Sequence, residues 1–167
     1  MIRTVLMAVN DDGPNSERVL DTVAVIRKLL TKGPFLEADY LVVPDEQAVI
    51  RSKLRMFSDR DTVDLILTTG GTGMLQKERT PEATREVIER EVPGLAEFMR
   101  IVGMRQSPRS ILFRGICGIR RKTLIVNLPG GPKGASDSLA AILPSLPPAM
   151  SYVSGHITDV SETWVEN

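Results

Sequence analysis

The amino-acid sequence predicts an α/β protein with a mostly parallel sheet that carries helices on both of its faces. Three observations lead to this fold class. Apolar runs typical of strands alternate with segments that have the 3.6-residue period of helices, an order that favours parallel strands. Glycine-rich turns follow two of the apolar runs, at 69–73 and 127–134. The length of 167 residues fits one domain, 1–167, with a buried core.

Three strand and helix pairs make up the first half of the chain. We expect strands at 3–9, 39–43 and 63–68, and helices at 18–30, 46–57 and 80–91. Apolar residues of the first helix recur at three- and four-residue steps, as in a helix that packs one face on a core. Thr80, Pro81 and Glu82 predict the start of the third helix, as N-cap, first-turn proline and an acid that favours the helix dipole.

A β-hairpin is expected in the second half. The apolar runs at 115–119 and 122–127 are separated by the basic pair Arg120 and Arg121. A hairpin makes its two strands antiparallel, so we expect the sheet to be mixed at this point.

The remaining segments are assigned from their composition. We expect a helix at about 95–102, a connector at 104–109, and closing helices at 136–143 and 147–153. Residues 111–113 fit a short helix or a strand. The acidic tail at 158–167, which contains Trp164, is expected to be loose or to pack on a neighbour.

Charge and residue usage exclude several functions. The 21 basic and 21 acidic residues cancel, so no broad field attracts nucleic acid or an anionic membrane. The apolar start is too short for a signal peptide and no run approaches a membrane span, so we expect a cytoplasmic protein. The single Cys117 is expected to be a buried thiol, and His156 has no partner for a metal site or a catalytic triad.

The glycine turn at 69–73 allows two interpretations. It could be a tight turn that requires positive φ angles, or a loop whose backbone N–H groups approach a phosphate beside a helix N-terminus. The second turn at 127–134 follows another apolar strand. Two such loops suggest one shared anionic ligand.

We expect the ligand site at the carboxyl ends of the strands. In open parallel sheets, ligands bind in the crevice outside these ends. The strand ends of this chain carry amides, carboxylates and a lysine, in the segments 10–14, 44–46, 69–73 and 129–133.

Two acids are candidates for a magnesium site. A carboxylate beside a phosphate repels it unless a cation intervenes, so Asp45 or Glu78 could hold Mg²⁺. Asp45 could instead be the N-cap of the helix at 46–57, and Glu78 could be a solvated charge. Lys133 could bind phosphate or keep its loop soluble.

Three motifs together resemble the molybdenum-cofactor biosynthesis family. They are LTTGGTG at 67–73, TPEAT at 80–84 and CGIRRKTLIVNLPG at 117–130. The family includes bacterial molybdopterin adenylyltransferases and the N-terminal domain of gephyrin, and the likeness runs from about Leu41 to Ala149. It implies a three-layer α/β fold, a homotrimer and other proteins of the same pathway as partners.

The resemblance also implies a reaction and its residues. In active members, the terminal phosphate of molybdopterin attacks the α-phosphate of Mg-ATP and releases pyrophosphate. Asp45 and Glu78 would then be catalytic acids that hold Mg²⁺, and the cap is disfavoured for Asp45. The phosphate-binding residues implied by the motifs are Gly70, Gly71, Thr72, Gly73, Arg114, Pro129, Gly130 and Lys133.

Several positions depart from the family pattern. Glu78 stands where relatives carry an aspartate, and a shift of one methylene in a positioning group can cost on the order of a hundredfold in rate. Phe113 replaces a serine, and the loop at 10–14 is shortened. Two functions are therefore open: an adenylyltransferase, or a molybdopterin-binding or scaffold protein of the pathway without transfer activity. An unrelated nucleotide-binding module is disfavoured.

Overall fold

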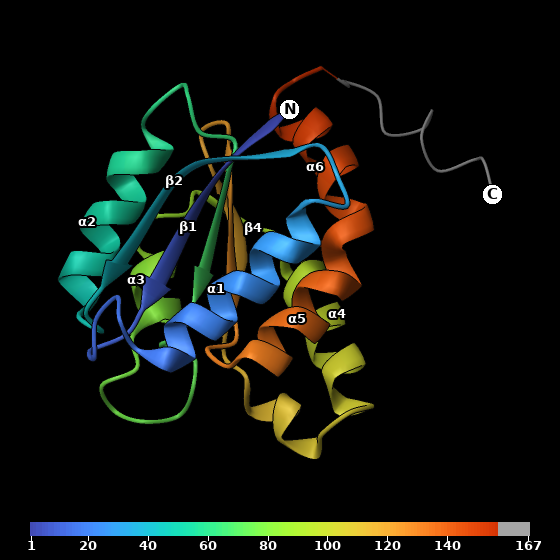
Figure 1. Cartoon of the computed structure of the whole chain (residues 1–167). Coiled ribbons are helices and arrows are strands. Elements are labelled where there is room, and N and C mark those ends of the chain that lie inside the picture. Colours follow the sequence, from blue (N-terminus) through green and yellow to red (C-terminus); the bar gives the residue numbers. More distant parts are fainter. Residues whose placement is uncertain (157–167) are drawn as a thin grey trace.

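A six-stranded mixed sheet forms the centre of the protein (Figure 1), as seen in a computed structural model that describes residues 1–156. The strand order is β2-β1-β3-β6-β5-β4. The strands are β1 (Ile2–Val9), β2 (Phe35–Val43), β3 (Leu65–Thr69), β4 (Arg90–Glu91), β5 (Cys117–Arg120) and β6 (Thr123–Leu128). Strands β2, β1, β3 and β6 are parallel, whereas β5 and β4 run antiparallel to their neighbours. The predicted mixed sheet and its hairpin are confirmed.

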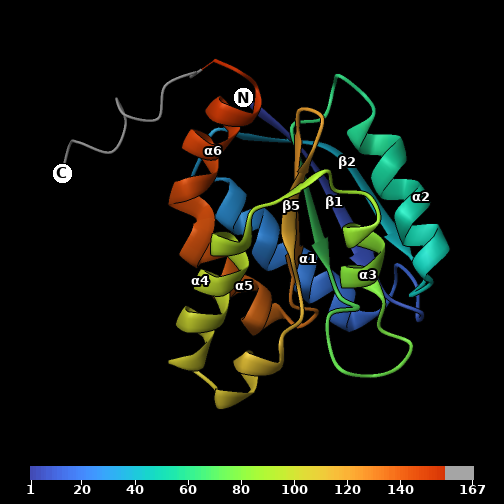
Figure 2. The same cartoon turned by 180° about the vertical axis from the view of Figure 1, so that it is seen from behind.

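Helices cover both faces of the sheet, so the protein has the three layers that were predicted (Figures 1 and 2). On one face lie α1 (Glu17–Leu30), α4 (Pro93–Met104), α5 (Pro132–Ile142) and α6 (Leu146–Val153). On the other face lie α2 (Gln47–Ser58) and α3 (Thr80–Arg85). Leu65 and Leu67 of β3 point into the first core and Ile66 into the second. A strand buried on both faces needs a continuous apolar run, which is what the sequence of β3 has.

No helix in residues 1–156 is both long enough and apolar enough to cross a membrane. The predictions for the tail at 158–167 and for Trp164 lie outside the described residues. Two short 3₁₀ helices complete the described chain, η1 (Pro108–Leu112) and η2 (Leu143–Ser145). The sequence allowed a short helix or a strand at residues 111–113. In the structure, Ile111 and Leu112 are the last two residues of η1, and Phe113 is its C-cap.

The third helix differs from its prediction in length. It ends at Arg85, not at residue 91, because the chain beyond it joins the edge of the sheet. Glu89 N donates to Ile119 O at 2.8 Å, and Val92 N donates to Cys117 O at 2.8 Å. Tertiary pairing with β5 therefore overrides the helix propensity of this segment.

The role predicted for Thr80 as N-cap was also wrong. The N-cap position is Arg79, and Thr80 is the first helical residue. Its hydroxyl donates to the carbonyl of Gly70 at 2.9 Å, so this threonine ties the helix to the glycine loop.

The boundaries of three other elements differ from the expected ones. β2 begins at Phe35, earlier than expected, and α4 extends from Pro93 to Met104. α5 begins at Pro132 rather than at 136, because a proline is favourable in the first turn of a helix. The earlier start brings the N-terminus of α5 into the second glycine loop.

A buried hydrogen-bond network links the sheet to the first glycine loop, at 69–73. Asn127 Nδ2 on β6 donates to the hydroxyls of Thr68 and Thr84, each at 3.0 Å, and its Oδ1 accepts from Ile116 N at 3.1 Å. The Thr84 hydroxyl donates to Thr80 O at 2.8 Å. Asn127, Thr68, Thr80 and Thr84 have no exposed surface, so each bond replaces one that water would otherwise supply.

Replacing the central residue of this network should destabilise the protein. Asn127→Ala leaves buried donors and acceptors without hydrogen-bond partners, so we expect the free energy of unfolding in urea to fall by about 2–4 kcal/mol. Asn15→Ala, at an exposed loop position, is the matched control and should change it by less than about 0.5 kcal/mol. Equal effects of the two substitutions would contradict a structural role for the network.

Candidate active site

A cavity of about 820 Å³ opens where the parallel strands end. These strand ends lie toward the bottom of the view in Figure 1. The lining of the cavity includes residues from all four predicted strand ends, among them Asp11, Asp45, Gly71 and Gly130. The connection from β1 leads to one neighbouring strand, β2, and the chain then returns to the other, β3. This reversal is the topological switch point at which α/β sheets bind ligands. A further wall comes from α4 and η1, which include Met99 and Ser110.

The glycine loop at 70–73 is the tight turn with positive φ angles that one interpretation of the sequence required, and it also lines the cavity. Gly70 and Gly71 have φ angles of +95° and +67°, which L side chains rarely adopt. A Cβ atom on Gly70 would collide with Val9 O, and one on Gly71 with the hydroxyl of Thr80. The same glycines line the cavity together with Thr72 and Gly73. The loop is thus a sterically demanding turn that also presents its backbone to the cavity.

The second glycine loop lies against the first. A Cβ atom on Gly130 would come within 3.0 Å of Gly70 Cα, and the hydroxyl of Thr69 donates to Pro129 O at 2.6 Å. α5 follows this loop directly, and the first amides of a helix have no intrahelical acceptor and attract anions. Lys133 lines the cavity, but its Nζ lies 3.1 Å from Asp137 Oδ2 and its side chain is 74% exposed.

Asp45 does not cap a helix. The N-cap of α2 is Glu46, which makes no side-chain cap bond, and Asp45 Oδ1 instead accepts from Arg79 N at 3.2 Å. Burial raises the pKa of Asp45, and the negative charges of Asp11 and Glu78 raise it further. A carboxylate held in such a position repels nearby negative charge and attracts a cation.

The other two acids take part in hydrogen bonds within the loops. Glu78 lies over Gly73, and its Oε2 accepts from Leu75 N at 2.9 Å. Asp11 Oδ1 accepts from Asp45 N at 2.9 Å, and its Oδ2 lies 3.0 Å from Lys77 Nζ. These bonds, the one from Asp45 N above all, lower the pKa of Asp11. Asp11 therefore ties the end of β1 to the end of β2 and to the first glycine loop.

Arg114 lies outside the set of residues that line the cavity. Its Nε donates to Gly73 O at 2.7 Å, and its Nη2 donates to Glu78 O at 2.9 Å. Nη1 pairs with the carboxylate of Glu82. The guanidinium thus joins the end of the first glycine loop, at Gly73, to Glu78 just before α3 and to Glu82 within α3.

Phe113, which departs from the family pattern, is accommodated by a glycine. A Cβ atom on Gly115 would collide with the ring of Phe113, and the guanidinium of Arg100 lies 5.4 Å from the ring centroid. Arg100 also donates to Phe113 O and Gly115 O, each at 2.7 Å. Phe113 forms part of the cavity wall, and its ring lies between Gly115 and Arg100 of α4.

Magnesium fits this site when it arrives with a phosphate ligand. Within residues 1–156, no group of three or more acidic, histidine or cysteine side chains forms a metal site by itself. Mg²⁺ is commonly bound by one or two carboxylates together with substrate phosphates and water. Asp45, whose Oδ2 accepts no hydrogen bond from the described residues, has the chemistry for such a ligand, and Glu78 lies near enough to raise its pKa.

Sequence reasoning did not select several charged residues of the cavity. They are Arg18, Lys77, Arg109 and Asp137. Arg18 lies in the first turn of a helix assigned from its apolar stripe, and the helical period gives no sign that its side chain reaches a distant loop. Its position near the start of the helix, at the end of the sheet where ligands bind, is the signal that could have identified it.

The fold and the cavity define an α/β protein that binds its ligand between glycine loops at the carboxyl ends of parallel strands. The family described as "Probable molybdopterin binding domain" matches residues 7–148, and the chain belongs to this family. The resemblance that the motifs indicated is thereby confirmed.

Two curated relatives are molybdopterin adenylyltransferases. The chain is 40% identical to that of Helicobacter pylori strain J99 over 127 residues, which are 76% of this chain and 72% of the relative. It is 35% identical to that of Escherichia coli K12 over 144 residues, covering 84% of this chain and 73% of the relative.

Two solved structures have the same fold. The molybdopterin biosynthesis enzyme MoaB from Thermus thermophilus matches with a TM-score of 0.86 and 54% identity, covering 93% of this chain and 98% of that one. The Mog protein from Mycobacterium ulcerans matches with a TM-score of 0.84 and 31% identity, covering 92% of this chain and 99% of that one.

A side chain in the first glycine loop should damage the site. Gly71→Ala forces a methyl group against Thr80 and Asp45 at a positive φ angle, so we expect a loss of more than about 2 kcal/mol of stability in urea unfolding. Gly94→Ala, in the first turn of α4 with no atom within 4 Å of the new Cβ, should change it by less than about 0.5 kcal/mol. If both variants unfold at the wild-type midpoint, the first glycine loop tolerates side chains and its steric requirement for glycine is wrongly assigned.

Proposed function

We propose that this protein binds molybdopterin and transfers AMP from Mg-ATP to its terminal phosphate. A phosphate oxygen of molybdopterin attacks the α-phosphorus of ATP, the bond to the β-phosphate breaks, and pyrophosphate leaves. One observation carries the proposal: two glycine loops and the N-terminus of α5 meet in one cavity beside Asp45. The activity named for the two curated relatives supports transfer over a scaffold role.

The site suits a reaction that needs positioning rather than a protein nucleophile. Residues 71–73, 130, 131, 133 and 134 line the cavity and carry backbone N–H groups, and such preorganised donors stabilise charge that develops during phosphoryl transfer. The one thiol cannot serve as a nucleophile, because burial raises the pKa of Cys117 to about 12. The cavity volume of about 820 Å³ lies within the usual range for ligand sites, roughly 300–1,000 Å³.

Each predicted site residue has a role in this proposal. Asp45 and Glu78 would hold the Mg²⁺ that accompanies ATP, which would supply neutralisation of phosphate charge next to their carboxylates. The phosphates lie on Gly70, Gly71, Thr72 and Gly73 and on Pro129, Gly130 and Lys133. Arg114 acts by holding the first loop in place. The cytoplasmic location stays a prediction from the sequence.

One assay tests the reaction directly. The purified protein is mixed with molybdopterin and Mg-ATP, and adenylylated molybdopterin and pyrophosphate are measured by mass spectrometry and a coupled assay. We expect both products in equal amounts. Binding of molybdopterin without product would favour the scaffold role, and binding of ATP alone would favour an unrelated nucleotide-binding module.

Asp45→Asn should separate activity from stability. We expect turnover to fall by about a hundredfold or more, because the variant lacks the charge that holds the cation. Folding raises the pKa of Asp45, so the ionised carboxylate is less favourable in the folded protein than in the unfolded chain. The charge therefore lowers the stability of the fold at pH values above about 4, the pKa of an aspartate in an unfolded chain. The melting temperature at pH 7 should therefore stay the same or rise.

The matched control is Asp21→Asn, which removes an exposed carboxylate from α1 without touching the cavity. It should leave both turnover and melting temperature near the wild-type values. A variant at Asp45 that keeps full turnover would remove this residue from the proposed mechanism.

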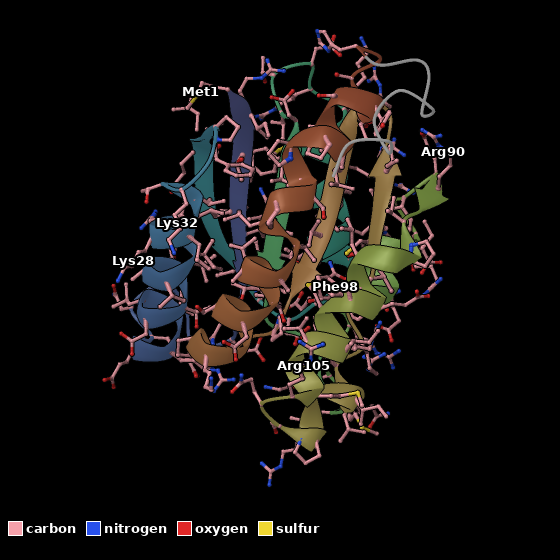
Figure 3. The ribbon with its side chains drawn as sticks, turned by 90° about the vertical axis from the view of Figure 1, so that its right-hand side faces the viewer. Met1, Lys28, Lys32, Arg90, Phe98 and Arg105 are labelled. Carbon is pink, nitrogen blue, oxygen red and sulfur yellow. The ribbon has the colours of Figure 1, made fainter. Side chains whose placement is uncertain are left out.

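We also propose a homotrimer, with other proteins of the same pathway as further partners. Apolar side chains are exposed along α4 and η1: Phe98, Ile101, Met104, Ile111 and Leu112. Figure 3 labels Phe98 on α4 and Arg105 directly after the end of this helix, on the side of the protein that faces the viewer. Exposed apolar patches of this kind mark protein interfaces.

Sedimentation velocity tests the assembly. Ile101→Glu places a charge in this patch and should convert trimers to monomers, because a buried unpaired carboxylate is unfavourable. Leu36→Glu, on a strand at the other edge of the sheet and similarly exposed, should leave the trimer intact. A monomeric wild type would reject the proposed assembly.

A further inference from the structure

The basic residues of the cavity differ in whether a carboxylate already pairs with them. Lys77 Nζ lies 3.0 Å from Asp11, and Lys133 Nζ lies 3.1 Å from Asp137. Arg18 and Arg109 also line the cavity, and neither forms an ion pair with any residue in 1–156. Of these two cations, Arg18 is the one whose side chain contacts a glycine loop.

The guanidinium of Arg18 packs against the second glycine loop. Its Nε donates to Gly130 O at 3.2 Å, which fixes the plane of the group beside the loop. A Cβ atom on Gly131 would lie 3.2 Å from Nη2 and 3.6 Å from Cζ. The absence of a side chain at Gly131 therefore makes room for the guanidinium.

Two of its nitrogens are unused by the protein. Within the described chain, neither Nη1 nor Nη2 of Arg18 donates a hydrogen bond, and the side chain is exposed at the cavity. The hydroxyl of Thr22 lies 3.3 Å from the same carbonyl and 2.7 Å from Arg18 O, so its one hydrogen is shared between the two acceptors and makes the weaker contact with Gly130 O. A structural role in holding the loop thus accounts for one nitrogen of the guanidinium and leaves two without a function.

We propose that Arg18 is a phosphate-binding residue of this site, and that its two Nη groups bind phosphate oxygens held on the second glycine loop. Arginine presents paired donors that match two oxygens of one phosphate, whereas lysine acts as a point charge. Lys133, the cation predicted for this loop, is already paired with Asp137. The inference rests on the proposed function for the identity of the ligand, which is the phosphate of molybdopterin or the polyphosphate of ATP.

The test compares four proteins in two measurements. The proteins are the wild type and the variants Arg18→Gln, Lys28→Gln and Thr22→Val. Lys28→Gln removes the same charge from the far end of the same helix, where Figure 3 labels it, and Thr22→Val removes the second donor to Gly130 O without changing charge. The measurements are the dissociation constant for inorganic pyrophosphate by calorimetry, and kcat and KM for each substrate.

We expect Arg18→Gln to weaken pyrophosphate binding by about 10- to 100-fold, as the loss of charge-assisted hydrogen bonds should. The KM for one substrate should rise by a similar factor: for ATP if the polyphosphate lies there, for molybdopterin if its phosphate does. Lys28→Gln should change neither measurement. Thr22→Val should have a much smaller effect than Arg18→Gln, which separates contact with phosphate from support of the loop.

Failure of this inference is distinguishable from failure of the proposed function. A wild type that makes adenylylated molybdopterin while Arg18→Gln keeps both KM values and the affinity for pyrophosphate would overturn the role of Arg18 alone. A wild type that makes no product but loses pyrophosphate affinity on Arg18→Gln would overturn the reaction and retain the phosphate site. A wild type that does not bind pyrophosphate, or a Thr22→Val variant that matches Arg18→Gln, would also overturn the inference.

Discussion

The site depends on one chain of buried hydrogen bonds, which runs from Asn127 through Thr84 and Thr80 to the carbonyl of Gly70. Gly70 and Gly71 adopt conformations that most residues avoid, and a turn of this kind persists only where its surroundings determine it. These hydrogen bonds supply that constraint from the centre of the sheet, where the side chains of Asn127, Thr84 and Thr80 are fully buried. The position of the first glycine loop is therefore set by the core of the protein and not by the loop itself.

Charge around the cavity is balanced locally. The chain carries equal numbers of acidic and basic residues, so no long-range field gathers anions at the site. Four charged groups of the cavity form two ion pairs, Lys77 with Asp11 and Lys133 with Asp137. Asp45 differs because burial and two nearby acids raise its pKa, and Arg18 differs because it has no carboxylate partner among the described residues. The cavity thus keeps groups of both signs that form no ion pair with the described residues, which matches a ligand that combines a cation with a polyphosphate.

The sequence predicted the sheet, its layers and the location of the cavity, because these depend on periodicity, glycine positions and the order of elements. It did not predict what depends on contacts between distant residues. Arg90 and Glu91 look helical but form a strand because β5 offers hydrogen bonds, and Thr80 looks like a cap but bonds to a loop instead. Arg114 matches a family motif, yet only the folded structure shows that its donors are used on backbone carbonyls. Arg18 was missed for the same reason, since its contact with Gly130 spans most of the chain.

The two sides of the cavity are built in different ways. The glycine loops touch each other and are anchored in the sheet, so they form a rigid floor with fixed chemistry. The opposite side, from Gln106 to Phe113, is a short 3₁₀ helix with flanking turns, joined to the body by Arg100 and by contact between Ser110 and Gly103. Substitutions in this segment change the shape of one wall of the cavity without touching the glycine loops. The two walls can therefore vary independently of each other.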